Sequence, residues 1–334
     1  MMITRLLAIL LAAAVVAPAA ADPVLLKVGF PSPPMSWTNT HGMTPWAQSV
    51  EKAADGLVEI KIFPGGSVAN FRNVYDRVIN GVVDIGFGPT GDISDQSPRS
   101  DVSSLPFEVR NASEASLALW RLFAKGELAA DYKAVKPVSL FALPTTTLHS
   151  SKPIRALADM RGMRLIVLSR LLGQAISTVD GTPLTMTAAE AYQSIDRGVA
   201  DGAAIAWAGV AVFKLQEVAK YHLEIPLGAA PATFFMNRES YARLPDKAKR
   251  AIDENSGERL SRTLGEAADA NDRESRERLS TVPGQTVTIL EAREAGAWRD
   301  RLKPIAEEWA RTAPDGAKVL AAFRAELASI RGGK

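Results

Sequence analysis

The sequence predicts an α/β protein of two similar lobes that face each other across a cleft. Residues 75–84 and 192–201 carry tyrosine, glycine, valine and aspartate at the same offsets. Each copy is typical of an amphipathic helix that ends at a glycine with positive φ and continues into a short strand ending at the aspartate. Because open α/β sheets bind ligands at the carboxyl ends of their strands, two such units predict a cleft between two lobes.

Alternating strand-like and helix-like segments argue against a chance match of those four positions. In the first half, strands are expected at 24–30, 58–63 and 82–87, and helices around Trp46, at 70–79 and around 117–123. Pro31, Pro33 and Pro34 end the first strand, and Asp55-Gly56 turns the chain into the second. This alternation predicts a parallel or mixed sheet.

The second half of the chain is expected to form the second lobe and to return once to the first. A strand at 138–143 enters a segment, 144–147, that is expected to cross between the lobes. Further elements are expected as strands at 163–168, 232–237 and 286–290, and as helices at 171–179, from Pro245 to about Leu279, at 302–309 and at 317–327. The expected division is lobe I at 22–145 and 232–265, and lobe II at 146–231 and 266–334.

The first 21 residues are typical of a cleavable export signal. Arg5 supplies a positive charge, Leu6 to Val16 form a short apolar run, and Ala19 to Ala21 form an A-x-A cleavage site before Asp22. The apolar run is short for a membrane span, although an uncleaved anchor is the alternative. We therefore expect a periplasmic protein of about 313 residues, which is enough for two sizeable cores.

The composition excludes several functional classes. The formal net charge is +2 and no basic run occurs, so nothing favours a nucleic-acid partner. The chain has no cysteine, which excludes disulfides and thiol chemistry. His41, His149 and His222 are far apart and none has a partner at metal-ligand spacing, so no metal site is expected.

Motifs of catalysis and cofactor binding are weak or missing. No G-x-S-x-G elbow occurs, and we expect no catalytic residues, no cofactor and no enzymatic activity. Residues 86–91 match G-x-G-x-x-G after a strand, but the polar segment at 92–104 contains Pro98 and lacks an apolar helical stripe. We interpret it as a ligand-facing loop. Asp84 and Asp201 are expected to bond backbone amides and hold the glycine turns rather than to act in catalysis.

Several ordered motifs identify a family resemblance. Residues 158–165, 190–192 and 198–202 resemble the solute-binding proteins of TRAP transporters, the DctP type. Gly181-Thr182-Pro183 and the segment from Asn237 to Pro245 also fit that pattern. The resemblance covers nearly the whole chain after the export signal, and it depends on the order and spacing of the motifs rather than on any single one.

The resemblance implies a two-lobed periplasmic binding protein fold with interwoven lobes, mixed sheets and a long helix spanning both. It also implies that a small solute, often an organic acid, is caught as the lobes close. A TRAP membrane permease, driven by an ion gradient, would then take the solute. The alternatives are a periplasmic hydrolase or lyase that uses the cleft, and a binding protein of an ABC uptake system.

The chain departs from the family at the residues that hold the ligand. The family motif ends in an arginine that grips a carboxylate, and Ile166 occupies that position here; an upstream arginine of some members aligns with Thr146. Losing a buried charged hydrogen bond costs about 2–5 kcal/mol of binding. Simple dicarboxylates are therefore expected to bind poorly. The ligand is expected to be an organic acid held by another arginine, or an aromatic, neutral or amine solute.

The sequence offers candidates for a cation that replaces the family arginine and for aromatic residues that line the ligand site. Arg72, Arg164 and Arg170 are candidates for the lost arginine, with a solvated surface role as the alternative for each. Aromatic side chains could form a cage for the solute, with core packing as the alternative. The expected ligand-binding residues are Ser32, Trp37, Asn70, Phe71, Arg72, Thr90, Thr146, Arg164, Ile166, Arg170, Trp207 and Phe234.

Overall fold

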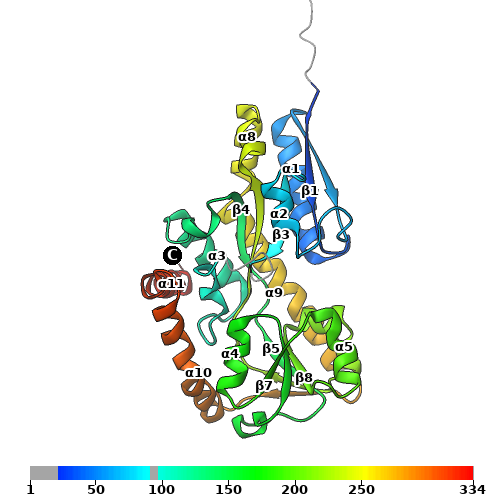
Figure 1. Cartoon of the computed structure of the whole chain (residues 1–334), viewed down its shortest axis with the longest axis vertical. Helices are drawn as coiled ribbons and strands as arrows, with labels where there is room; N and C mark the ends of the chain where they lie inside the picture. The colour runs from blue at the N-terminus through cyan, green and yellow to red at the C-terminus, as the bar shows by residue number, and fades with distance from the viewer. Residues whose placement is uncertain (1–21, 91–96, 334) are drawn as a thin grey trace, which may run out of the picture.

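The computed structural model describes residues 22–90 and 97–333, which form two α/β lobes stacked along the long axis of the molecule (Figure 1). Each lobe is built on its own mixed sheet. The expected fold class is therefore confirmed. Within the described residues, no helix is long and apolar enough to cross a membrane.

Lobe I is built on a five-stranded sheet. Its strands are β1 (Val24–Gly29), β2 (Val58–Phe63), β3 (Ile85–Pro89), β4 (Val135–Ala142) and β10 (Pro231–Asn237), in the order β2-β1-β3-β10-β4. β1 runs parallel to β2 and β3, whereas β10 runs antiparallel to β3 and β4. The helices of this part of the chain are α1 (Thr44–Ala54), α2 (Val74–Ile79) and α3 (Ala112–Ala124).

Lobe II is built on a six-stranded sheet. Its strands are β5 (Thr147–Ser150), β6 (Arg164–Val167), β7 (Thr182–Thr185), β8 (Gly202–Ile205), β9 (Tyr221–Glu224) and β11 (Thr286–Ile289), in the order β11-β9-β5-β8-β6-β7. β5 is antiparallel to β8 and β9, and the other pairs are parallel. Its helices are α4 (Arg170–Thr178), α5 (Ala188–Asp196) and α6 (Trp207–Val212).

The sequence repeat is a structural repeat. In both copies a helix ends at a glycine, Gly81 after α2 and Gly198 after α5, and both have φ of 69°. The two N–H groups after each glycine bond one carbonyl of the helix, that of Arg77 in the first copy and that of Ser194 in the second. Because these bonds close the helix end, the chain enters the sheet only afterwards. Each aspartate therefore precedes its strand, which corrects the expectation that it ends the strand.

The aspartates of the repeat bond backbone amides, as expected, but the amides belong to the neighbouring strand rather than to the glycine turns. Asp84 accepts the N–H of Lys27 on β1 at 2.8 Å, and Asp201 accepts the N–H of Arg164 on β6 at 2.9 Å. Both carboxylates are buried. Their position before β3 and β8 matches the register of the two parallel pairs.

Two antiparallel segments connect the lobes. One leads from β4 to β5 and the other from β9 to β10, and they are tied by hydrogen bonds from Thr146 N to Gly228 O at 2.9 Å and from Leu227 N to Thr146 O at 3.1 Å. Gly228 has φ of 94°, and a Cβ there would lie 2.2 Å from the carbonyl oxygen of Ser104. The second crossing therefore requires glycine.

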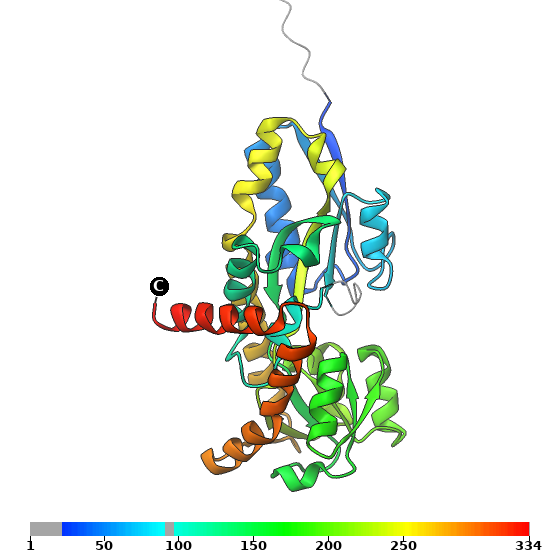
Figure 2. The same cartoon turned by 60° about the vertical axis from the view of Figure 1, so that its left-hand side comes forward.

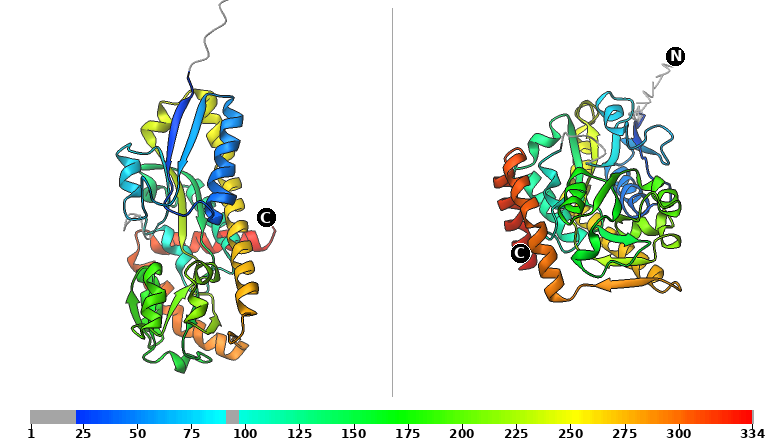
Figure 3. Two further views of the ribbon diagram at one scale, coloured as in Figure 1. Left: turned by 90° about the vertical axis from the view of Figure 1, so that its right-hand side faces the viewer. Right: turned by 60° about the horizontal axis from the view of Figure 1, so that its bottom comes forward.

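The expected single helix from Pro245 to Leu279 is two helices. α8 (Asp246–Asn255) and α9 (Glu258–Ser280) are separated by a break in which Gly257 has φ of 77°. The Gly257 N–H bonds the carbonyl of Val138 on β4, so a tertiary contact fixes the break. α9 then runs along both lobes, where it packs against α3 and α6 (Figure 3).

The last two helices divide between the lobes. α10 (Ala292–Thr312) packs against α4, whereas α11 (Gly316–Arg331) packs against α3 (Figure 2). Arg324 and Arg331 of α11 pair with Glu108 and Glu114. The expected division placed all of 266–334 in lobe II, but α11 lies on the helix that covers lobe I.

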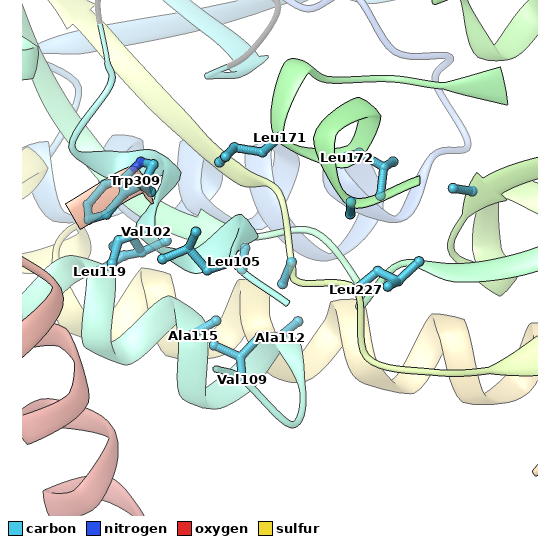
Figure 4. Close-up of a cluster of buried hydrophobic side chains, with 14 of the residues drawn as sticks. Val102, Leu105, Val109, Ala112, Ala115, Leu119, Leu171, Leu172, Leu227 and Trp309 are labelled. Atoms are coloured by element: carbon cyan, nitrogen blue, oxygen red, sulfur yellow. The ribbon is translucent and has the colours of Figure 1, made fainter. Parts of the chain in front are cut away.

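A hydrophobic cluster joins the lobes on the side of α10. Val102, Leu105 and Leu119 of lobe I belong to the same buried cluster as Leu171 of α4 and Trp309 of α10 (Figure 4). Each is at most 4% exposed. The lobes are therefore interwoven in their cores as well as in their strands.

Candidate ligand-binding cleft

Several expected ligand-binding residues follow the carboxyl ends of strands in the two lobes. Ser32 and Trp37 follow β1, and Thr90 follows β3. In lobe II, Arg170 follows β6 and Trp207 follows β8. Strand ends of parallel pairs are the usual ligand sites of open α/β sheets.

Arg72 of lobe I and Glu190 of lobe II lie close enough for their charges to interact. Glu190 accepts hydrogen bonds from the Thr187 hydroxyl at 2.6 Å and the Thr187 N–H at 2.8 Å. These bonds, together with the charge of Arg72, hold the pKa of the Glu190 carboxyl below its ordinary value. The start of α5 and the turn before α2 therefore approach each other from opposite lobes.

Two of the expected aromatic residues keep part of their rings exposed. Trp37 packs edge-on against Phe141 with 6.2 Å between ring centroids, and Phe71 packs edge-on against Phe87 at 5.9 Å. Both rings are half-buried at the margin of the lobe I core. Core residues hold each ring, which leaves the remaining surface free to contact a solute.

The other two expected aromatic residues lie inside the cores. Phe234 is 0% exposed and packs among Phe30, Phe87 and Phe141. Trp207 is 2% exposed and lies against His149 in lobe II. Core packing, the alternative weighed from the sequence, therefore describes both rings in this conformation.

The two strand residues at the family's ligand motif are also engaged in lobe II. Arg164 donates to Asp201 from Nε at 3.0 Å and from Nη2 at 3.1 Å. Ile166 is 1% exposed and packs with Ala191 and Ile195 of α5. Arg164 is thus bound to Asp201, and Ile166 is a core residue rather than a polar contact.

Arg72 and Arg170 are exposed cations without a salt bridge. Neither guanidinium makes a hydrogen bond or ion pair with another residue in the part of the chain that the structure describes. Arg170 begins α4, and its neighbour Ser169 accepts the N–H of Leu172 at 3.2 Å. Arg170 also lines a cavity of about 530 Å³ between α4, β7 and α10. Neither arginine is held in a salt bridge by a described residue, although the charge of Arg72 acts on Glu190 of the other lobe.

The remaining expected residues are mostly fixed by the backbone around them. Thr146 lies in the first crossing, and Thr90 is buried with its hydroxyl donating to the Pro231 carbonyl at 3.3 Å. The carbonyl of Ser32 accepts Gly65 N, and the side chain of Asn70 accepts Arg72 N at 3.0 Å. Asn70 therefore orders the turn that carries Arg72.

The glycine-rich segment serves packing at its first position. A Cβ at Gly86 would lie within 3 Å of Val74, Val78 and Phe235, so glycine allows α2 to approach the sheet. Residues 91–96 of the expected ligand-facing loop lie outside the described residues. Among those described, no group of three or more histidine, aspartate or glutamate side chains could hold a metal ion.

Sequence reasoning missed Leu168 and Glu190. Leu168 directly follows β6 and is 44% exposed, although it was expected inside the strand. Its apolar run with Leu165 and Val167 gave no sign that the strand ends one residue earlier. Glu190 was noticed only as part of a family motif, and its approach to Arg72 depends on how the two lobes are placed.

The comparisons with known proteins agree with this geometry. Residues 33–312 match the DctP family, described as bacterial extracellular solute-binding protein, family 7. The chain belongs to that family. The C4-dicarboxylate-binding periplasmic protein DctP of Rhodobacter capsulatus is 22% identical, over 93% of each chain. An outer membrane transporter protein, TsaT, of Comamonas testosteroni is 25% identical over 66% of this chain and 66% of its own, just under two thirds of its length.

Solved structures of TRAP solute-binding proteins share the fold. A marine metagenome protein specific for aromatic acids, in complex with 3-hydroxybenzoate, is 25% identical with a TM-score of 0.86, over 92% of this chain and 99% of its own. A Bordetella bronchiseptica protein with bound (R)- and (S)-mandelate is 26% identical with a TM-score of 0.83, over 92% and 100%. This DctP-family chain is thus a solute-binding protein of the TRAP type.

Proposed function

We propose that this DctP-family protein binds an aromatic monocarboxylate in the periplasm and delivers it to a TRAP membrane permease. One observation carries the proposal. The position of the family arginine is filled by Ile166, which is 1% exposed in the core, while the half-buried rings of Trp37 and Phe71 and the exposed guanidiniums of Arg72 and Arg170, which form no salt bridge with the described residues, remain. Such a site offers aromatic surface and one or two cations, but no arginine held in place to bind a second carboxylate in a bidentate way.

The neighbouring structures support the choice of an aromatic acid. Two of these structures contain 3-hydroxybenzoate and mandelate, respectively, and each ligand is an aromatic ring with a single carboxylate. By contrast, the R. capsulatus relative is named for C4-dicarboxylates. We place this chain with the first group because a single cation suffices for a monocarboxylate.

A thermal-shift screen tests the ligand class. A ligand at about 100 times its dissociation constant stabilises the fold by about 2.7 kcal/mol. Benzoate, 3-hydroxybenzoate and mandelate are expected to raise the melting temperature, whereas succinate and malate are not. Strong stabilisation by a C4-dicarboxylate, or by an amine alone, would overturn the proposal.

Single replacements then identify the cation that holds the acid. Arg72→Met and Arg170→Met remove the exposed guanidiniums, and Arg259→Met on the exposed side of α9 is the matched control. One of the first two is expected to weaken benzoate binding at least tenfold, and the control is expected to leave it unchanged. Equal affinity in all three variants would exclude both arginines.

Binding without turnover, and export, are tested separately. Benzoate recovered unchanged after long incubation supports a binding protein, and steady conversion would favour the enzyme alternative.

N-terminal sequencing of the exported protein is expected to begin at Asp22, because residues 1–21 have the pattern of a signal peptide. A neighbouring gene for a multi-spanning permease supports the TRAP partner, and a neighbouring ATPase gene favours an ABC system.

A further inference from the structure

Lobe II contains a buried polar network that includes none of the proposed solute contacts. His149 on β5 and His222 on β9 are 0% and 1% exposed, and their Nδ1 atoms are 2.7 Å apart. The outer nitrogen of each ring also has a partner. His149 Nε2 lies 3.1 Å from Ile205 O and 2.9 Å from Thr147 Oγ1, and His222 Nε2 lies 2.8 Å from Gln285 Oε1.

The partners fix where hydrogens are required. Gln285 donates from Nε2 to the carbonyl of Gln216 at 3.0 Å, so its Oε1 faces His222 Nε2 as an acceptor. His222 Nε2 must then carry a hydrogen. The carbonyl of Ile205 is likewise only an acceptor, so His149 Nε2 needs a hydrogen to bond it. A third hydrogen is needed between the two Nδ1 atoms, because 2.7 Å is a hydrogen-bond distance.

Two neutral imidazoles carry two hydrogens, whereas the pair offers places for three. In the neutral pair the single hydrogen of the Thr147 hydroxyl has two acceptors in reach, His149 Nε2 at 2.9 Å and Ile205 O at 3.3 Å, and it can serve only one of them fully. One additional proton satisfies all three places at once. We propose that His149 and His222 form a buried binding site for a single proton, shared between their Nδ1 atoms and in contact with the ring of Trp207.

Trp207 supplies the surface that a charged pair needs. Its ring centroid lies 4.8 Å from that of His149 and 4.4 Å from that of His222. Aromatic faces attract cations, and most strongly when both are desolvated. The Trp207 ring lies at 75° to the His149 ring and at 43° to the His222 ring, and its indole Nε1 makes no hydrogen bond to the described residues.

Other charges around the pair oppose one another. Burial lowers the pKa of both histidines, and Lys220 lowers that of His222 further, whereas Glu224 on β9 raises it. Glu224 is itself paired with Arg276 on α9. Asp272, also on α9, accepts the N–H of Ala208 beside Trp207. Histidine ordinarily takes up a proton near pH 6.5. This pair is therefore expected to take up its proton only at a lower pH.

Nuclear magnetic resonance tests this site directly, because the chain has only three histidines. In uniformly 15N-labelled protein without ligand, the ring nitrogens of His149 and His222 are expected to shift together in one step between pH 8 and 4.5. That step should lie below pH 6.5 and bring a downfield proton shared by the two rings. Two independent steps, or two rings that stay neutral at pH 4.5 in folded protein, would overturn the proposal.

Variants add a second measurement. His222→Gln is expected to abolish the shared step, and His41→Gln, at an exposed histidine, is expected to leave it in place. Trp207→Leu removes the ring face and should move the step down by about one pH unit. An unmoved step in Trp207→Leu would remove the ring from the site. If a variant does not fold, the titration of the unaltered protein alone tests the proton site. That test does not depend on whether the protein binds benzoate.

Discussion

At the scale of single residues, Asp201 shows how one carboxylate can organise a lobe through several partners. It accepts the N–H and guanidinium of Arg164 and pairs with Lys152 at 2.7 Å. The hydrogen bonds from Arg164, with Lys152 as the second partner, hold the pKa of the Asp201 carboxyl far below its ordinary value. Asp84 occupies the equivalent place in lobe I, where it accepts the Ser240 hydroxyl and the guanidinium of Arg243.

Asp201→Asn is expected to destabilise the protein by about 2–3 kcal/mol, because several charged hydrogen bonds are lost at a buried group. The depressed pKa means that this stabilisation is complete above the unfolded value of about 3.9 and is lost as the pH falls below it. Urea unfolding at pH 7 measures the change. Asp180→Asn, in an exposed pair with Arg301, is the control and should cost less than about 1 kcal/mol. Equal costs for the two variants would contradict the assignment.

Asp272 behaves in the opposite way. Burial raises the pKa of its carboxyl to about 6, opposed by the N–H groups of Ala208 and Trp207. A folded pKa above the unfolded one means that the group favours folding at low pH and that this contribution is lost as the pH rises through 6. Asp272→Asn keeps an oxygen for Ala208 N and removes the charge, so it should raise stability more at pH 8 than at pH 4.5. Loss of stability at pH 8 would show that the favourable interaction of the Asp272 charge with the N-terminus of α6 is larger than the cost of burying that charge.

Residue roles could be predicted only where local pattern decides them. That Asp84 and Asp201 bond backbone amides was predicted and is confirmed, but the amides lie on the neighbouring strands β1 and β6 and not in the glycine turns. The environment of Arg164 and Ile166 could not be derived, although their shared face could. In the structure, Arg164 contacts Asp201 and Ile166 contacts α5. These contacts depend on how β6 is aligned with β8, and the spacing of residues in the sequence does not reveal that alignment.

At the scale of elements, the repeated helix end gives a paired test. Gly81 and Gly198 have the same positive φ, and nothing lies within 4 Å of a Cβ at either position. Alanine at either glycine should therefore cost only the backbone strain, about 1–2 kcal/mol. The two costs should be equal, because the two turns have the same geometry.

Gly296→Ala is the matched control for this pair. It lies inside α10 with open space around it, so alanine there should stabilise by about 0.5–1 kcal/mol. Urea denaturation of the three variants provides the comparison. Unequal costs at Gly81 and Gly198 would mean that the two lobes unfold independently, or that one turn relaxes.

The break between α8 and α9 shows what element prediction lacks. Charged helix-forming residues continue across Ser256 and Gly257, and a helical pattern alone passes through them. The break is fixed by the bond from Gly257 to Val138 and by the Trp46 indole donating to Ser256 at 3.2 Å. Both partners are distant in sequence, so local propensity cannot locate the helix end.

At the scale of the whole molecule, α9 connects the lobes through two carboxylates three residues apart. Asp269 accepts the N–H groups of Ala112 and Ser113 at the start of α3, at 2.7 and 2.9 Å. Asp272 accepts the N–H of Ala208 on α6 at 2.8 Å. The single helix α9 therefore holds α3 on one side and α6 on the other, and the two lobes are also connected by the crossings at Thr146 and Gly228. This arrangement is typical of a hinge in which a few element ends absorb the rotation.

We expect the lobes to close on the ligand by rotation about these crossings. The absence of cysteine allows site-specific spin labels without background. Labels at Asn80 and Arg197, exposed and equivalent positions after α2 and α5, should move closer when saturating benzoate is added. A pair at Asn80 and Lys61, both in lobe I, should keep its distance. Because the cross-lobe pair reports rotation and the control pair reports distortion within a lobe, an unchanged cross-lobe distance with bound benzoate would exclude closure by hinge rotation.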